Sequence, residues 1–142
     1  MVDDNAHGLT ARKAVLEEQG HTVTAVSNGK EALEQFAVTK FDLVVTDYRM
    51  PRMSGLEVIA GVRQLAPEVP VILLSGFVDS LGLNEQSTGA DGVIQKSAHE
   101  VRHLTHMVEQ LLARKPRRAP PGRKPAMAEA AAEPRQVKRK PA

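Results

Sequence analysis

Five polar residues stand at the ends of short apolar runs in this 142-residue chain: Asp3, Asp4, Asp47, Ser75 and Lys96. Clustered carboxylates bind a hard divalent cation, typically Mg²⁺, through their oxygen atoms. An aspartate can also be a nucleophile that accepts a phosphoryl group. In that reaction a metal ion and a lysine neutralise the transferring oxygens, and a hydroxyl donates a hydrogen bond to one of them. The set therefore indicates phosphoryl transfer to a carboxylate, provided that the fold brings the five side chains together.

Alternating strands and helices are the elements that would position them. Apolar runs predict strands at 21–27, 41–46, 69–75 and 92–95, with Met1 and Val2 as the end of a first strand. Helical periodicity predicts helices at 9–20, 29–39, 54–66 and 97–115, and a weaker one at 79–91. This alternation predicts a parallel sheet between two helix layers, a three-layer α/β sandwich. Ligands of such sheets bind at the carboxyl ends of the strands, where the five polar residues are expected.

Two helices show a capping-box pattern at their start, Ser54 with Glu57 and Ser97 with Glu100. Spacing also predicts which side chains face inward from the helices. They are Leu9, Val15, Leu16, Ala32, Leu33, Phe36, Val101, Leu104, Val108, Leu111 and Leu112. Met50 and Met53, in the loop after Asp47, are interpreted as packing residues.

Composition divides the chain into an acidic domain at 1–113 and a basic tail at 114–142. Hydrophobic residues make up 42% of the chain, which excludes wholesale disorder. The tail holds ten Lys/Arg against two Glu, a charge of +8, whereas the rest holds nine against fifteen acidic residues, a charge of −6. Six of the nine prolines lie in the tail, which is expected to be disordered. The chain lacks cysteine and an N-terminal signal pattern, so a cytoplasmic protein without disulfides is expected.

Four motifs, in order, resemble the receiver (CheY-like) domain of two-component response regulators. They are "VDDN" at 2–5, "DLVVTDYRMPRMSGLEV" at 42–58, "PVILLSG" at 70–76 and "GADGVIQK" at 89–96. The resemblance covers residues 1–113. It implies a flavodoxin-like fold with a five-stranded parallel sheet in the order 2-1-3-4-5.

The resemblance also implies a role for each residue. Asp47 would be the phosphoacceptor, and Asp3 and Asp4 would hold Mg²⁺ together with Asp47 and the backbone carbonyl of Arg49. Ser75 would be the switch hydroxyl and Lys96 the phosphate-binding lysine. The phosphodonor would be a histidine kinase or a phosphotransfer protein, and a downstream protein partner would bind at roughly 81–112. The chain would be no dedicated enzyme, but it would catalyse its own Mg²⁺-dependent phosphorylation and dephosphorylation.

The sequence departs from the family at three places. Only Met1 and Val2 precede the acidic pair, so the first strand is truncated or the native start lies upstream. Ser97 replaces the proline that usually follows the lysine in a cis peptide. A non-proline cis bond costs roughly 2.5–4 kcal/mol, so a trans bond and a displaced Lys96 are expected. Val93 replaces the aromatic switch residue, which puts the usual output mechanism in doubt.

Several alternatives remain open. A degenerate receiver would act as a protein-docking module without being phosphorylated. A phosphatase of the haloacid dehalogenase type would need an acid two residues after the nucleophile, where Arg49 stands. His99, His103 and His106 share one helix face and could bind Zn²⁺, although a solvated or partner-facing surface is favoured. The basic tail could contact nucleic acid non-specifically, but it lacks the aromatic residues and the motif of a sequence-specific reader; no membrane contact is expected.

Overall fold

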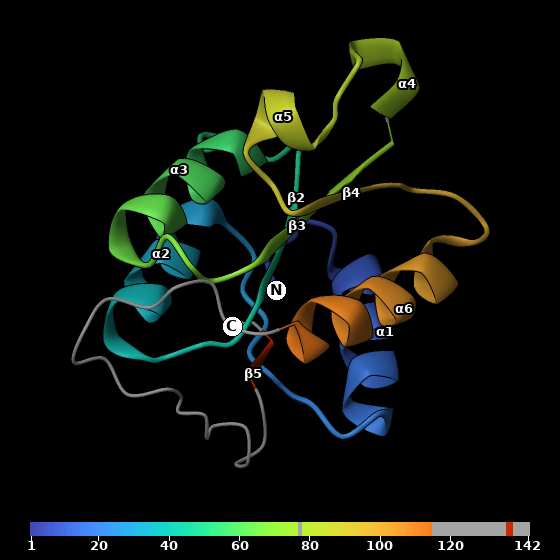
Figure 1. Cartoon of the computed structure of the whole chain (residues 1–142), viewed down its shortest axis with the longest axis horizontal. Coiled ribbons are helices and arrows are strands. Elements are labelled where there is room, and N and C mark those ends of the chain that lie inside the picture. The colour runs from blue at the N-terminus through green and yellow to red at the C-terminus, as the bar shows by residue number, and fades with distance from the viewer. Residues whose placement is uncertain (77, 115–135, 138–142) are drawn as a thin grey trace.

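Helices and strands alternate through most of the chain, as the periodicity predicts. The structure is a computed structural model and describes residues 1–76, 78–114 and 136–137. The elements are α1 (Ala6–Glu18), β1 (Thr22–Val23), α2 (Gly29–Val38), β2 (Val44–Asp47), α3 (Gly55–Leu65), β3 (Val71–Ser75), α4 (Val78–Leu81), α5 (Glu85–Thr88), β4 (Gly92–Gln95), α6 (Glu100–Ala113) and β5 (Gln136–Val137). Figure 1 shows the central strands between two helix layers, with α2 and α3 on one face and α1 and α6 on the other.

The central sheet is parallel, in the order β2-β3-β4. Its side chains alternate between two apolar clusters because successive residues of a strand point to opposite faces. Val44 and Leu73 belong to a first core under α2 and α3, whereas Val45 and Leu74 belong to a second core under α1 and α6. Burial on both faces explains why β2 and β3 begin with apolar residues that do not alternate with polar ones. The predicted three-layer α/β sandwich is thus confirmed.

The first strand is reduced to a single residue, Val2, which forms parallel bridges to Val26 on one side and Thr46 on the other. Its amide donates to the carbonyl of Val45 at 2.8 Å, and its own carbonyl accepts from the amide of Asp47 at 2.9 Å. The order across the sheet is therefore the predicted one, with Val2 between the β1 segment and β2. Five full strands are not formed in the described residues, because only Met1 and Val2 are present to build the first.

The tail lies mostly outside the described residues, so its predicted disorder stays a prediction there. Its described part, β5, pairs in parallel with β1, placing Gln136 opposite Thr22 and Val137 opposite Val23. The expectation of an unstructured tail does not hold for these two residues. Their backbone groups continue the hydrogen-bonded edge that β1 offers.

Of the two capping boxes predicted at helix starts, one is present and the other is not. The capping box at Ser54 and Glu57 is confirmed, with both side chains bonded to the backbone. The second box is wrong: α6 has no side-chain cap hydrogen bond, and Glu100 binds Arg12 instead. The weak helix predicted at 79–91 is two helices of four residues each, α4 and α5, separated at Gly82 with a φ of +67°.

Most of the predicted inward-facing side chains do lie in the cores. Leu16, Ala32, Leu104, Val108 and Leu111 are buried, and Leu9, Leu33, Phe36 and Leu112 pack against the cores from partly buried positions. Val101 is an exception, since 38% of it is exposed. Met50 is buried in the first core and Met53 packs against it, as predicted. In the described part of the chain, no helix combines the length and apolar character that crossing a membrane requires.

Candidate functional site

Parallel strand pairing brings Asp47, Ser75 and Lys96 to one edge of the sheet. Asp47 is the last residue of β2 and lies opposite Leu74 of β3, so Ser75 is the next residue along. The amide of Lys96 donates to the carbonyl of Ser75 at 2.8 Å, which sets Lys96 beside the end of β3. Asp47 and Ser75 are both buried, at 5% and 2% exposure.

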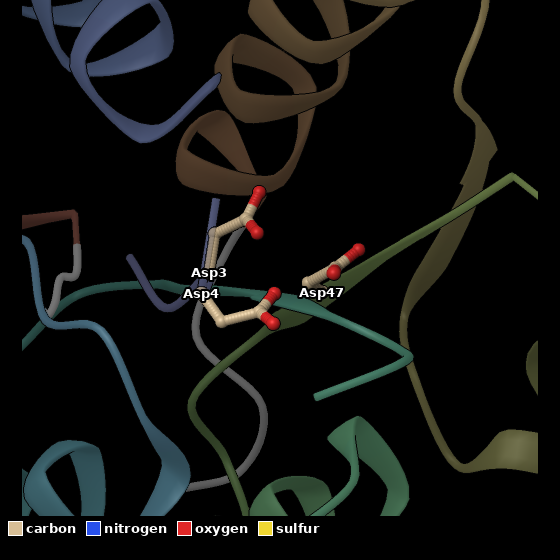
Figure 2. Close-up of side chains that lie close together, drawn as sticks. All are labelled: Asp3, Asp4 and Asp47. Atoms are coloured by element: carbon tan, nitrogen blue, oxygen red, sulfur yellow. The ribbon is translucent and has the colours of Figure 1, made fainter. Parts of the chain in front are cut away.

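Asp3 and Asp4 reach the same edge because the Val2 bridges align the first segment with β2. The amide of Asp3 donates to Val26 at 3.2 Å, so the backbone remains in register with the sheet up to this residue. Asp3 is buried and Asp4 is exposed. One carboxylate oxygen from each of Asp3, Asp4 and Asp47 lies within 4.8 Å of the others (Figure 2). Three convergent carboxylates, one of them open to solvent, suit a hydrated Mg²⁺ ion.

Lys96 lies over these carboxylates. Its Nζ is 2.7 Å from Oδ1 of Asp47 and 3.7 Å from Oδ2 of Asp3. No peptide bond among the described residues is cis, so the bond before Ser97 is trans, as expected. The long side chain of Lys96 reaches Asp47 with this trans bond, and the expected displacement of Lys96 relative to the family stays a prediction.

Burial makes the charge of Asp47 costly. Desolvation raises the pKa of Asp47 from 3.8 to about 6; the hydrogen bond from Lys96 opposes this rise, and the charge of Asp3 adds to it. Without a metal ion, about half of this carboxyl is therefore protonated near pH 6 and about a tenth at pH 7. A further positive charge at the site would favour the ionised form, which is the nucleophile.

Arg12 and Glu100 belong to the site and were not predicted from the sequence. Arg12 is 5% exposed, and its Nη1 and Nη2 both lie 3.1 Å from Oδ2 of Asp3. Its Nε donates to Oε2 of Glu100 at 3.0 Å. Helical spacing could have predicted that Arg12 faces inward, because position 12 lies on the same side of the helix as Leu9 and Leu16, which face the second core.

The loop after Asp47 is held by tight packing of α3 on β2. A Cβ built on Gly55 would meet the carbonyl oxygen of Asp47 and would lie 2.9 Å from Cα of Tyr48. The amide of Gly55 donates to the carbonyl of Tyr48 at 2.8 Å. Arg49 is exposed in this loop, and a metal contact by its carbonyl stays a prediction.

The three histidines at the start and in the first half of α6 do not assemble into a metal site. His99, His103 and His106 are exposed, and the rings of His99 and His103 lie 6.4 Å apart between centroids. Within the described residues, the carboxylates Asp3, Asp4 and Asp47 are the one group of potential ligands that converges. The solvated-face interpretation of the histidines is therefore favoured over the zinc interpretation.

Comparison with known proteins adds independent findings. A model of the response regulator receiver domain family matches residues 1–109. The response regulator receiver protein CpdR of Brucella abortus is 31% identical over 111 residues, which are 78% of this chain and 91% of CpdR. The crystal structure of the response regulator TrrA from Thermotoga maritima, in complex with Mg(2+)-BeF, is similar with a TM-score of 0.69 and 33% identity. That similarity covers 78% of this chain and 94% of TrrA.

Other relatives are much longer than this chain. The transcriptional regulatory protein ZraR of Escherichia coli is 34% identical over 77 residues, which are 54% of this chain but 18% of ZraR. The match is thus confined to a small part of that regulator. What the remainder of such a regulator does carries no information about this chain.

Proposed function

This chain belongs to the response regulator receiver domain family of two-component systems, and on that premise we propose that Asp47 is its phosphoacceptor. The donor would be a histidine kinase or a phosphotransfer protein. One observation carries the proposal: a buried carboxylate at the end of β2 lies within a converging group of three carboxylates and binds Lys96 through Oδ1 at 2.7 Å.

The side chains that the transfer needs from this chain lie at this edge of the sheet. A carboxylate oxygen of Asp47 attacks the donor phosphorus; a new O–P bond forms while the bond from phosphorus to the leaving group breaks, and the leaving group departs with the electron pair. Lys96 neutralises charge on the transferring oxygens, and the Ser75 hydroxyl donates a hydrogen bond to one of them. Mg²⁺, held by Asp3, Asp4 and Asp47 with the Arg49 carbonyl as a further ligand, would supply electrostatic stabilisation of the same oxygens. Attack of water on the phosphoaspartate would return the free carboxylate.

Phosphorylation of Asp47 would alter the binding of a protein partner at the surface formed by roughly 81–112. This surface differs in two ways from a continuous helix packed beside an aromatic switch. Its first part holds only the short helix α5, which follows the equally short α4, and Val93 packs against the first core as a partly buried aliphatic residue. An aromatic ring moving toward Ser75 therefore has no counterpart at this position.

Acetyl phosphate with Mg²⁺, followed by intact-mass measurement, tests the acceptor role. The wild-type chain should gain one phosphoryl group, ~80 Da, and lose it again on standing. The adduct should be absent from Asp47→Asn and strongly reduced in EDTA. Asp42→Asn, which changes a carboxylate just before β2 at the opposite end of the strand, should leave the adduct unchanged.

The alternative is the degenerate receiver that only docks a partner. It predicts no adduct on the wild-type chain at millimolar acetyl phosphate, with or without Mg²⁺. An adduct that persists in Asp47→Asn would instead assign the acceptor to another residue. Either result would contradict the proposal.

A further inference from the structure

Arg12 is the one buried cation of the described chain that the acceptor chemistry does not use. Arginine is almost never fully buried unless it is paired, because removing its charge from water is costly. Here the side chain is 5% exposed, belongs to the middle of α1 and binds Glu100 of α6. A group held at such a cost next to a reactive carboxylate cluster calls for an explanation beyond packing.

The guanidinium of Arg12 bridges two carboxylates that come from opposite ends of the domain. Two of its nitrogens, Nη1 and Nη2, share Oδ2 of Asp3, and the third, Nε, binds Glu100. Glu100 is the first residue of α6. The acidic site and the first turn of α6 are therefore joined through one planar cation, which binds carboxylates with fixed geometry.

The preceding turn of α1 leaves room for this group. A Cβ on Gly8 would lie 2.7 Å from Nη1 and 3.1 Å from Nη2 of Arg12. Glycine inside a helix costs roughly 1 kcal/mol relative to alanine, so the position is not optimised for helix formation. Gly8 lies four residues before Arg12, and because it has no side chain it leaves space for the guanidinium of Arg12.

Arg12 competes with a divalent cation for the same carboxylate. Nη1 and Nη2 of Arg12 and Nζ of Lys96 already surround Oδ2 of Asp3. Oδ1 of Asp3 accepts a hydrogen bond from the amide of Asn5 at 2.9 Å. A dication bound to Asp3, Asp4 and Asp47 would lie within a few ångströms of the guanidinium. Like charges at that distance repel strongly in a partly buried site. Glu100 offers Arg12 a second anion to remain with when the first is taken.

We propose that Arg12 is a positioning residue that sets the affinity of the acceptor site for its divalent cation and passes metal loading to α6. It holds Asp3 in the metal-free protein, yields Asp3 to the cation, and shifts toward Glu100 as it does so. The inference rests on the proposed function only in taking Asp3, Asp4 and Asp47 as the metal-binding carboxylates.

Mg²⁺ titration of three variants tests this competition without any phosphodonor. Binding is followed by calorimetry and by fluorescence of Tyr48, which is the single tyrosine of a chain without tryptophan and is adjacent to Asp47. Arg12→Met should bind Mg²⁺ at least ~10-fold more tightly than wild type, because a like charge has been removed. Arg12→Lys keeps the charge and should stay within ~3-fold of wild type, as should Lys13→Met, which removes a neighbouring surface charge.

The link to α6 has a separate readout. In wild type, Mg²⁺ should shift the backbone amide resonances of residues 100–104, and this shift should be lost in Arg12→Met and reduced in Glu100→Gln. If Arg12→Met does not fold, Gly8→Ala serves in its place, since it displaces the guanidinium while improving the helix. It should also tighten Mg²⁺ binding.

Three results would overturn the inference. They are wild-type Mg²⁺ affinity in both Arg12→Met and Gly8→Ala, an undiminished amide shift of α6 in Arg12→Met, and no Mg²⁺ binding by any of these proteins. The acceptor role is judged separately, by whether the wild-type chain gains a phosphoryl group. If the wild-type chain is phosphorylated but Arg12→Met and Gly8→Ala bind Mg²⁺ with wild-type affinity, the inference is refuted and the acceptor role is unaffected.

Discussion

Asp47 illustrates a conflict at the scale of a single residue between what stabilises a fold and what serves chemistry. Strand β2 places its carboxylate, the proposed nucleophile, in a buried position that is shielded from water and close to Lys96. The same burial disfavours its negative charge. The ionised form, which the proposed phosphoryl transfer requires, is therefore the form that the metal-free fold tolerates least.

This conflict predicts that Asp47→Asn stabilises the metal-free protein, and does so only above mildly acidic pH. The pKa of Asp47 is about 6 in the folded chain against 3.8 as its ordinary value, so the folded state binds more protons between these limits. Stability then falls as pH rises through this window and the full penalty, about 1–3 kcal/mol, is present above it. In EDTA, urea unfolding should find Asp47→Asn more stable than wild type at pH 8, with the difference gone below pH 3.8.

A surface carboxylate provides the control for this effect. Glu18→Gln, at an exposed position near the end of α1, should change stability by less than about 0.5 kcal/mol at every pH. A wild-type chain as stable as Asp47→Asn at pH 8, or a stability difference that does not vary with pH, would argue against a destabilising charge at Asp47.

At the scale of elements, the first turn of α3 is what fixes the end of β2. The capping box of Ser54 and Glu57 starts the helix at Gly55, which lies against the backbone of Asp47 and Tyr48. No side chain fits between them. The backbone of Asp47 is thus held by contact with the backbone of Gly55, which cannot yield as a flexible side chain can.

Gly55→Ala should therefore impair both folding and phosphorylation. The added methyl meets the carbonyl oxygen of Asp47, Cα of Tyr48 and Cδ1 of Leu73, so the start of α3 must move away from β2. We expect a loss of about 1–3 kcal/mol in unfolding free energy, together with slower transfer from acetyl phosphate. Gly76→Ala, where an added Cβ meets nothing within 4 Å, should change stability by less than about 0.5 kcal/mol. Equal effects of the two substitutions would show that the contact at Gly55 is unimportant.

The elements also show how far sequence patterns reach. Long periodic segments such as α2 and α3, and apolar runs such as β3, were predicted because their own residues decide their structure. The convergence of Asp3, Asp47 and Lys96 followed from strand ends in a parallel sheet.

Glu100 does not cap α6 because its side chain binds Arg12, which lies 88 positions earlier in the sequence. A local sequence motif gives no information about a partner so far away in the sequence. The split of 79–91 into α4 and α5 was missed for a different reason: segments of four residues are too short to show a period.

At the scale of the whole molecule, two cores on opposite faces of one sheet account for the stability of the domain. All buried hydrophobic side chains of the described residues lie between Met1 and Leu111. The charges divide differently, since residues 1–113 carry −6 and residues 114–142 carry +8. The apolar core and the positive charge of the chain are thus assigned to separate segments.

This separation predicts that a chain ending at Arg114 folds and works as a receiver domain. It keeps both cores, the Arg12 bridge and all five predicted site residues, and it loses β5, which contributes two residues beside β1. The unfolding free energy should change by less than about 1 kcal/mol, because no buried apolar side chain of the cores is removed. Acetyl phosphate should label the shortened chain at the wild-type rate. A loss of several kcal/mol would instead mean that pairing of β5 with β1 stabilises the edge of the sheet beside the single bridging residue Val2, and the tail would then belong to the folded domain.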